Sequence, residues 1–553
     1  MAAMALRGGG GAGGEGGQYD LAVIGGGSGG LACAKQAARL GAKVALFDYV
    51  SPSPAGTAWG FGGTCVNVGC IPKKLFHYGA LLGEGLHDAR KMGWSGVVDE
   101  HLHGKHNWEE LVGTVRNYVK KLNFSYRNGA RAAGVEYINA KASFAAGSEK
   151  VVEYTLKGER KSLTASNVLI AVGGRPFVPP MRGAELAITS DDIFYRTKVP
   201  GRTLVVGGGY IAMECAGFLT GLGYPVSLAV RSKPLRAFDG QMADKITEIM
   251  REAGTKFLIG RTPAALAQAA GGRIAVEFDD GSKDTFDTVL VATGRAPDTA
   301  ALNAPKHLAV DAKSGKFVAD VQTNLVKGSK SVYAVGDCLL GAPELTPVAI
   351  RDGETLAKRL FGPNNKLIFN KDFIPTTVFT PSEYGTVGLS QEEAEARLGK
   401  SKVECFLYDW PTLERACVHR EKHPDARKDD ADVDAGNNCM AKLVCEKLPG
   451  DFKVVGWHFI GPNAGEVTQG FALAVKMGVK KVSGRARRIA FHFSLRRLVR
   501  RVHAPALTLS DPAPAPACLC LFSLTLTIWW ASTLLTRRPL STSRSRRARE
   551  KAS

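Results

Sequence analysis

The stretch YDLAVIGGGSGGLACAKQAARLGAKVALFD, residues 19–48, contains the pattern that predicts the fold of this chain. It opens with a short apolar run, Tyr19–Ile24, which meets a glycine-rich turn. A helical pattern follows and stops at Gly41, and a second apolar run, Lys43–Phe47, comes next. A strand, a turn, a helix and a second strand in this order predict a βαβ unit.

The turn has the Gly-x-Gly-x-x-Gly spacing at Gly25, Gly27 and Gly30. Glycine at these positions lets the backbone turn tightly, lets a pyrophosphate approach and lets the helix pack on the strand, while the helix N-terminus faces the anion. Asp48 follows the second strand, where a carboxylate can bind the hydroxyl groups of a ribose. We therefore predict a dinucleotide site, and the alternative for Asp48 is a solvated strand end.

A second unit of the same kind, residues 203–230, begins about 180 residues later. Its fingerprint positions are Gly207, Gly209 and Ala212. Arg231 and Arg236 follow its second strand, where an acidic residue would favour NAD. Guanidinium groups form paired hydrogen bonds with phosphate, so these residues favour NADPH over NADH, although they could also be surface arginines without a ligand. Two such units predict two nucleotides.

The strongest local signal is GGTCVNVGCIPKK, residues 62–74. Its two cysteines, Cys65 and Cys70, are separated by four residues and precede a helical stretch. They can sit one helical turn apart, with their thiolates favoured by the helix dipole and by nearby lysines. This arrangement predicts a reversible disulfide; the alternative is a pair of inert buried thiols.

These motifs together resemble the FAD-dependent pyridine nucleotide–disulfide oxidoreductases, from about Tyr19 to Gly478. Within that family, FDYVSPSPAGTAWGFGGTCVNVGCIPKK is similar to the high-molecular-weight thioredoxin reductases, whose disulfide motif follows a Pro-containing segment and a Trp-Gly pair, here Trp59-Gly60. Further matching stretches are ALLGEGLHDARKMGW, ELTPVAIRDGETLAKRLFG, PTTVFTPSEYGTVGLS and GPNAGEVTQGFALAVKMG.

The resemblance implies an α/β fold with two Rossmann-like dinucleotide-binding domains, for FAD and NADPH, and an α+β dimerisation domain. The predicted segments are a flexible Gly-rich N-terminus (1–17), the first part of the FAD domain (18–172), the NADPH domain (173–296), the second part of the FAD domain (297–372), an incomplete dimerisation domain (373–478) and an atypical basic tail (479–553). We expect LIAVGGRP and LVATGRAPDT, at residues 169–176 and 290–299, to connect domains.

The resemblance also implies roles for four catalytic residues. Cys70 would lie against the flavin and form the charge-transfer and transient adduct species, and Cys65 would be the interchange thiol that faces the substrate. Lys73 would pair with Glu214 beside the reactive edge of the flavin.

Other residues are expected to bind the cofactors. Tyr210 would gate the nicotinamide pocket, Gly294 would line it, and Asp337 would hold the ribityl chain of FAD. Thr64 is a further expected cofactor contact, and no metal site is expected.

The implied reaction is NADPH + H⁺ + protein disulfide → NADP⁺ + dithiol, with thioredoxin as the disulfide and cell redox homeostasis as the purpose. One alternative is glutathione reductase, against which the Trp59-Gly60 pair argues. The other is a non-catalytic flavin-binding scaffold, which would bind flavin without reducing disulfides.

The amino-acid composition indicates which broad class of protein this is. Apolar residues at 45% and charged residues at 22% are typical of a globular protein and exclude collagen-like, disordered and multispanning chains. Eleven cysteines in 553 residues are too few for a disulfide-stapled secreted protein, and the first twenty residues lack the apolar core of a signal peptide. We therefore expect a cytoplasmic location.

The net charge of +20 is concentrated in the last part of the chain. Residues 479–553 hold 16 Lys and Arg but 2 Asp and Glu, so they account for +14 and leave +6 for residues 1–478. The nearly balanced body gives no reason to expect nucleic-acid binding.

Residues 479–553 also differ from the family, whose members end with a His-Pro-Thr segment that is followed by a Glu. His492 and His503 do not fit this pattern, so the dimerisation domain is expected to be incomplete, and dimerisation, implied for the family, stays open for this chain. We interpret Cys518 and Cys520 as apolar tail residues rather than a second redox pair.

Two interpretations of the tail remain. The favoured one is that it is not family coding sequence, for instance a read-through or a frame error. The other is a genuine extension in which the largely apolar 18-residue stretch Cys518–Leu535, followed by seven Lys and Arg, contacts a membrane, although its Ser and Thr residues weaken this interpretation.

Overall fold

The computed structural model describes residues 18–96, 106–418, 437–481 and 500–501. The expectations for residues 1–17, for His492 and His503, and for Cys518–Leu535 fall outside these ranges and stay predictions. Within the ranges, no helix is both long enough and apolar enough to cross a membrane.

The first βαβ pattern forms part of a largely parallel sheet, here called the first sheet. β1 (Gln18–Ile24) lies between β2 (Val44–Phe47) and β6 (Glu159–Ile170), with β3 (Glu136–Ile138) beyond β2 and β17 (Val332–Ala334) beyond β6. β5 (Val151–Leu156) pairs antiparallel with the start of β6, and β4 (Ala142–Phe144) pairs with β5. Two distant segments of the chain therefore build one sheet.

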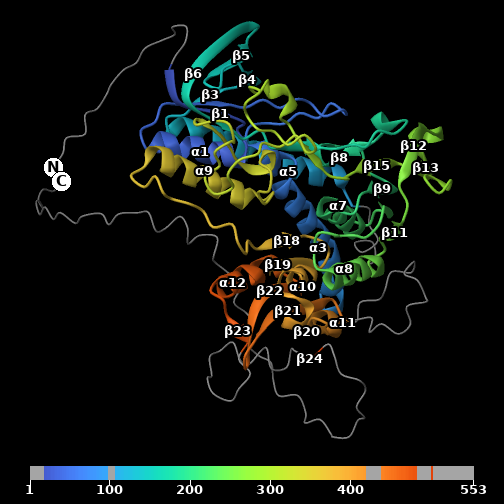
Figure 1. Ribbon diagram of the computed structural model, residues 1–553. Helices are drawn as coiled ribbons and strands as arrows, with labels where there is room; N and C mark the ends of the chain where they lie inside the picture. The colour runs from blue at the N-terminus through green and yellow to red at the C-terminus, as the bar shows by residue number, and fades with distance from the viewer. Residues whose placement is uncertain (1–17, 97–105, 419–436, 482–499, 502–553) are drawn as a thin grey trace, which may run out of the picture. The chain divides into compact units, whose positions relative to one another are not determined.

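Three helices cover one face of the first sheet. α1 (Ser28–Arg39), α9 (Thr346–Phe361) and α5 (Trp108–Ala132) contribute to an apolar core with Leu21 and Val23 of β1. α1 and α9 run side by side (Figure 1). α1 follows β1 directly, so its start lies at the carboxyl end of that strand, where nucleotides bind in open α/β sheets.

The second βαβ pattern forms the second sheet, which is parallel throughout. Its strand order is β11 (Lys256–Ile259), β10 (Val226–Val230), β9 (Thr203–Val206), β15 (Thr288–Val291) and β8 (Ile188–Thr189). Its βαβ helix is α7 (Tyr210–Gly221), α8 (Gly240–Glu252) follows β10, and a three-stranded antiparallel sheet is attached: β12 (Pro263–Gln268), β13 (Ile274–Phe278) and β14 (Lys283–Phe286).

The two connections expected between domains lie side by side. β7 (Gly174–Pro176) and β16 (Arg295–Pro297) pair antiparallel and form a two-stranded ribbon.

The third sheet is antiparallel and belongs to the segment where the resemblance implies an α+β domain. Its order is β18 (Thr376–Val378), β19 (Glu383–Gly388), β22 (Asp451–Gly461), β21 (Cys439–Leu448), β20 (Val403–Trp410) and β24 (Arg500–Arg501), and β23 (Lys480–Lys481) pairs with β22. Its helices are α10 (Gln391–Leu398), α11 (Leu413–Val418) and α12 (Ala464–Lys476). Because β23 and β24 belong to residues 479–553, the sheet continues past Gly478.

An aromatic cluster fixes the helix that contains the second cysteine. The ring of Phe76, on α3 (Cys70–Lys91), lies edge-on to Trp108, Phe194 and Phe218, with centroid distances of 5.2 to 5.3 Å. Phe218 belongs to α7, and Phe194 directly follows the short helix α6 (Ser190–Ile193). α3 is therefore packed against the second βαβ unit.

Close packing of α1 on α9 requires a glycine. At Gly353, a Cβ would lie 2.3 Å from the carbonyl oxygen of Gly29. We expect Gly353→Ala to destabilise the protein by about 1–3 kcal/mol, as overpacking does. Gly113→Ala is the matched control, because it makes the same helix-favouring change in α5 with no atom within 4 Å of the new Cβ. Denaturant unfolding measures both variants, and equal stabilities would contradict the close packing.

Candidate active site

A cavity of about 940 Å³ brings together strand residues of the first and third sheets and residues of α7, the helix that follows β9 of the second sheet. This volume is in the range of cofactor pockets, roughly 300–1,000 Å³. The predicted site residues that line it are Gly25, Gly27, Asp48, Thr64, Cys65, Cys70, Lys73, Tyr210, Glu214 and Asp337. The predicted residues outside its lining are Gly30, Gly207, Gly209, Ala212, Arg231, Arg236 and Gly294.

The first glycine turn leaves its backbone open to the cavity. Gly25 has a φ of +111°, and a Cβ at Gly30 would lie 1.9 Å from the carbonyl oxygen of Gly25. Gly27 is the N-cap of α1, and no side chain caps the helix there. The free N–H groups of this helix start fit the pyrophosphate of a dinucleotide such as FAD.

Asp48 is half-buried beside the cavity rather than solvated at a strand end. Its Oδ1 accepts a hydrogen bond from the Gly26 N–H at 3.0 Å, and burial raises its pKa to about 6. Its position fits the ribose role, which stays a prediction.

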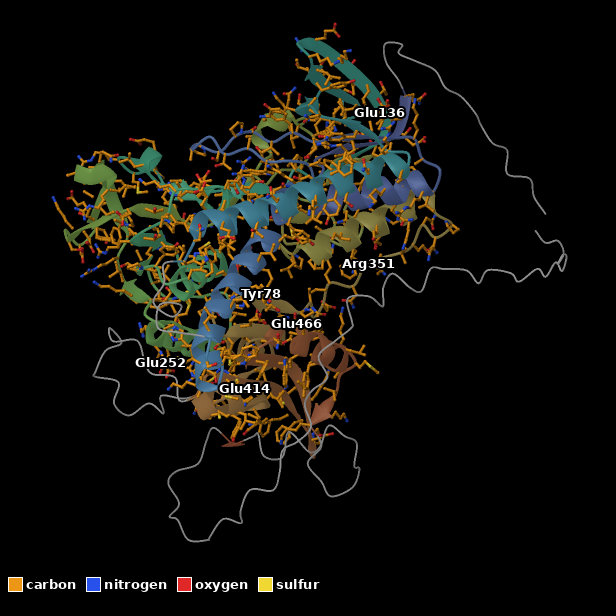
Figure 2. All side chains as sticks on the ribbon, turned by 180° about the vertical axis from the view of Figure 1, so that it is seen from behind. Tyr78, Glu136, Glu252, Arg351, Glu414 and Glu466 are labelled. Carbon is orange, nitrogen blue, oxygen red and sulfur yellow. The ribbon has the colours of Figure 1, made fainter. Side chains whose placement is uncertain are left out.

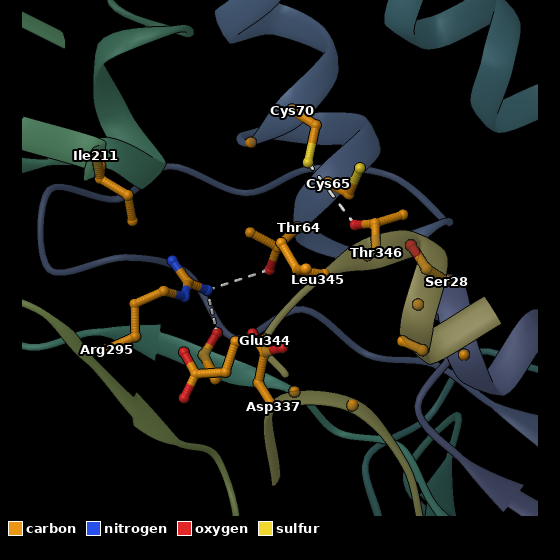
Figure 3. A pocket seen from close by; sticks show the side chains of 18 of the residues that line it. Ser28, Thr64, Cys65, Cys70, Ile211, Arg295, Asp337, Glu344, Leu345 and Thr346 are labelled. Carbon is orange, nitrogen blue, oxygen red and sulfur yellow. Dashed lines mark hydrogen bonds between the residues drawn. The ribbon is translucent and has the colours of Figure 1, made fainter. Parts of the chain in front are cut away.

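The two cysteines come from consecutive helices. Cys65 lies in α2 (Gly63–Asn67), Cys70 is the first residue of α3, and both are free thiols. The Sγ of Cys70 lies 3.7 Å from the Oγ1 of Thr346, the first residue of α9 (Figure 3). The starts of two helices therefore meet at Cys70, where their dipoles favour negative charge.

The two thiols differ in acidity. The pKa of Cys70 is lowered to about 6, mainly by the hydrogen bond from the Cys65 thiol and, against the effect of burial, by the charge of Lys73. The same hydrogen bond, together with burial, raises the pKa of Cys65. In the dithiol form, the thiolate therefore belongs to Cys70.

Lys73 and Glu214 form a nearly buried ion pair, as the resemblance implies. The Nζ of Lys73 is 2.8 Å from Oε1 of Glu214, and the two side chains are 13% and 4% exposed. The same Oε1 accepts the Phe379 N–H at 2.9 Å, and Nζ lies 4.0 Å from the centroid of the Phe379 ring. Phe379 lies between β18 and β19, so this pair joins α3, α7 and the third sheet.

Asp337 faces a cation that the sequence patterns did not single out. Asp337 lies in the short 3₁₀ helix η4 (Gly336–Cys338), and burial and the Glu344 charge raise its pKa. Arg295 lies across the pocket from it, donating to Oγ1 of Thr64 at 3.4 Å and to the carbonyl oxygen of Gly174 (Figure 3).

Arg295 and Thr346 are the site residues that sequence reasoning missed. Arg295 stands next to Gly294 in LVATGRAPDT, and Thr346 lies in ELTPVAIRDG. The local patterns of these stretches do not show that Arg295 reaches Thr64 or that Thr346 reaches Cys70.

The second glycine turn repeats the geometry of the first. Gly207 has a φ of +138°, and a Cβ there would lie 2.3 Å from the carbonyl oxygen of Ala292. Gly209 is the N-cap of α7 without a side-chain cap, and Ala212 is fully buried. Gly294, with a φ of +140°, accepts the Phe177 N–H through its carbonyl oxygen.

Two exposed arginines follow β10. Neither Arg231 nor Arg236 forms a hydrogen bond or an ion pair with any residue that the structure describes, whereas Lys233 between them pairs with Asp244 at 3.1 Å. Two unpaired guanidinium groups beside an open helix start fit a dinucleotide with an additional phosphate, as in NADPH.

Comparisons with known proteins agree with this geometry. Residues 19–353 match the model of the pyridine nucleotide-disulphide oxidoreductases, and residues 374–501 match the dimerisation domain of the same group. The chain therefore belongs to the pyridine nucleotide-disulphide oxidoreductase family.

Its similar relatives are thioredoxin reductases. One from Plasmodium falciparum (isolate FCH-5) is 48% identical over 84% of this chain and 85% of the relative. One from Emiliania huxleyi is 46% identical over 84% and 91%, and the mitochondrial thioredoxin reductase 2 of Drosophila melanogaster is 45% identical over 83% and 86%.

These findings confirm the recognition and the α/β fold. The protein is a flavoprotein oxidoreductase that acts on a disulfide, and the cofactors of its family are FAD and NADPH, as expected. The match reaches residue 501, past Gly478, where we expected the resemblance to end. The domain boundaries, the individual site roles and the cytoplasmic location stay predictions.

The acidity of Cys70 predicts a pH dependence. A pKa of about 6 lies below the usual thiol value of about 8.5, so the thiolate is present at neutral pH and lost as the pH falls through 6. The long-wavelength absorbance of a thiolate beside flavin in the reduced protein should disappear over the same range.

Lys73→Met should raise the midpoint of that titration, because the Lys73 charge helps to hold the thiolate. Lys74→Met is the matched control, since Lys74 pairs with Glu383 at 2.5 Å instead. A midpoint that moves with Lys74→Met but not with Lys73→Met would contradict the assignment.

Proposed function

We propose that this protein is an NADPH-dependent thioredoxin-disulfide reductase that works as a homodimer in cell redox homeostasis. The main support is the position of the Cys65–Cys70 pair, at one cavity with an open glycine turn and the Lys73–Glu214 ion pair. Relatives named thioredoxin reductases, similar over more than four-fifths of the chain, support the choice of substrate.

In this proposal, each nucleotide has its own set of residues. The first glycine turn, Asp48 and Asp337 hold FAD, and Arg231 and Arg236 bind the 2′-phosphate of NADPH. When bound, the flavin accepts hydride from the nicotinamide and passes an electron pair to the disulfide. The Lys73–Glu214 pair holds a fixed positive charge beside Cys70, where the thiolate is released.

The cysteines complete the reaction by thiol–disulfide exchange. After reduction of the Cys65–Cys70 bond, the sulfur of Cys65 attacks the substrate disulfide and forms a mixed disulfide, releasing the first substrate thiol. The Cys70 thiolate then attacks the Cys65 sulfur, which releases the second thiol and restores the Cys65–Cys70 bond. The pKa difference suits the second step, because the resolving thiolate is stabilised at Cys70. In the first step, the Cys65 thiol gives up its proton as it attacks, and the substrate thiolate that leaves takes up a proton.

Steady-state turnover distinguishes the alternatives. We expect NADPH-dependent reduction of thioredoxin to be faster than reduction of glutathione disulfide. Faster turnover of glutathione disulfide would favour a glutathione reductase. Flavin binding without turnover of either disulfide would favour a non-catalytic scaffold.

Serine variants test the two thiol roles. Cys65→Ser and Cys70→Ser should each abolish thioredoxin reduction, because each breaks the disulfide. Only Cys70→Ser should also remove the long-wavelength absorbance of the reduced protein. Cys405→Ser, at a free cysteine on β20, should leave both properties unchanged. If Cys65→Ser and Cys70→Ser give the same spectrum, the assignment of the two sulfurs is wrong.

Arg231→Ala tests the choice of nucleotide. Hydrogen bonds to charged groups contribute about 1.5–3 kcal/mol, so the variant should bind NADPH roughly ten- to a hundredfold more weakly and leave NADH unaffected. Arg273→Ala, at another exposed arginine near the same sheet, serves as the control. Equal losses for NADPH and NADH in Arg231→Ala would refute the 2′-phosphate role.

A further inference from the structure

The loop that bears the two unpaired arginines, residues 231–239, is held near its middle and at its far end. Near its middle, the Leu235 N–H donates to the carbonyl oxygen of Gly208, in the second glycine turn, at 2.7 Å. Leu235 has a φ of +48°, an uncommon conformation for a residue other than glycine. Such a conformation persists only where the surroundings fix it, so the loop has a defined path.

The far end of this loop is fastened to the third sheet. Asp239 caps α8 by accepting the Met242 N–H, and its Oδ2 accepts the Gln391 N–H at 3.0 Å. Its Oδ1 lies 2.9 Å from the Nζ of Lys442 on β21, and the two side chains are 0% and 1% exposed. Asp239 is three residues from Arg236, so this buried ion pair sits where the loop ends.

Lys442 lies at the end of a row of polar side chains on neighbouring strands. In the strand register, Lys442 lies opposite His458 on β22, and His458 lies opposite Thr386 on β19. Nδ1 of His458 accepts from the Tyr384 hydroxyl at 2.8 Å, and its Nε2–H donates to the Leu389 carbonyl oxygen at 3.1 Å. Burial lowers the pKa of His458, which leaves Lys442 as the cation that meets Asp239.

Two more ion pairs join α8 to the third-sheet region, but away from the loop. Lys245, in the middle of α8, lies 3.3 Å from Asp409 on β20. Glu252, at the end of α8, lies 3.7 Å from Arg415 on α11, and Figure 2 shows Glu252 on the same side of the molecule as Glu414. The Asp239–Lys442 pair is thus the one of these three that meets the loop.

A buried ion pair contributes little to stability compared with apolar side chains of similar volume. What distinguishes it is that it fixes the relative positions of its two charged groups. We propose that Asp239 and Lys442 are positioning residues for the 2′-phosphate of NADPH. The third sheet, through Lys442, fixes the end of the loop and so the direction of Arg231 and Arg236. This inference rests on the NADPH preference proposed above.

The test uses a double variant, Asp239→Asn/Lys442→Met, in the full-length, flavin-loaded protein. Asparagine caps a helix as well as aspartate, and methionine keeps the length of lysine without its charge. Calorimetric titration of the oxidised protein with NADP⁺ and NAD⁺ measures binding without turnover. We expect NADP⁺ affinity to fall about tenfold, the lower limit for a lost hydrogen bond to a charged group, while NAD⁺ affinity changes less than twofold.

The matched control is Lys245→Met/Asp409→Asn, which removes a pair that joins the same two parts without touching the loop. It should leave both affinities unchanged. If it lowers the NADP⁺ affinity as much as the test variant does, general docking of α8 explains the result and the inference is wrong. An unchanged NADP⁺ affinity, or equal loss of NADP⁺ and NAD⁺, in the test variant would also overturn it.

Arg231→Ala separates this inference from the proposed function. If the ion pair acts through Arg231, Arg231→Ala should weaken NADP⁺ binding strongly in the native protein and only slightly in the double variant. If Arg231→Ala spares NADP⁺ in the native protein, the proposed nucleotide preference fails. If Arg231→Ala selectively weakens NADP⁺ binding in the native protein and weakens it by the same factor in the double variant, only the positioning role fails.

Folding of the variants is monitored by flavin content and thermal unfolding. Should the double variant lose flavin, Lys442→Gln replaces it, because glutamine keeps a hydrogen-bond donor for Asp239. The expected change is then smaller and in the same direction, a selective loss of NADP⁺ affinity. No selective loss would overturn the inference.

Discussion

The carboxylate of Glu214 constrains the arrangement of the whole site. It is 4% exposed, and its Oε1 meets both the Lys73 ammonium group and the Phe379 N–H. A buried charge is tolerated only when it is paired and hydrogen-bonded, and losing one partner of such a pair typically costs about 3–5 kcal/mol. The helix with Cys70, the nucleotide helix α7 and the third sheet therefore cannot shift independently. The rings around Phe76 reinforce the same contact by filling the space between α3 and α7.

The two glycine turns share the same local geometry. The backbones at Gly25 and Gly207 adopt φ values that favour glycine, and each α-helix that follows begins without a side-chain cap. Unsatisfied N–H groups at a helix start attract an anion. The start of α3 is also uncapped by a side chain, but there the negative charge belongs to the chain itself, as the thiolate of Cys70. In the proposed function, uncapped helix starts thus serve two external phosphates and one internal sulfur.

Local spacing explains which features the sequence could predict. Both βαβ units and the cysteine pair depend on residues within about 30 positions of each other, so their patterns are visible in the sequence. β19 has no clear strand pattern in the sequence, because EYGTVG contains two glycines and begins with Glu383, a buried carboxylate. Glu383 is acceptable there because Lys74 and the His77 ring, from α3, meet it. Thr346 and Arg295 could not be found for a related reason, since Cys70 is 276 positions from Thr346 and Thr64 is 231 positions from Arg295.

The number of cationic side chains around the second sheet does not locate the proposed phosphate site. A cation that is already paired with another side chain is not free to bind a phosphate. Around the second sheet, Arg202 binds Asp284, Lys233 binds Asp244 and Arg251 lies over the Phe257 ring. Each of these charges already has a partner, so a phosphate would have to compete for it. Arg231 and Arg236 have none within the described ranges, and their loop touches the second glycine turn through Leu235. In the proposed function, a phosphate held by these arginines is also favoured by the helix dipole at the start of α7. Pairing therefore singles out Arg231 and Arg236 as candidates for the proposed phosphate site, which a net charge of +20 leaves undefined.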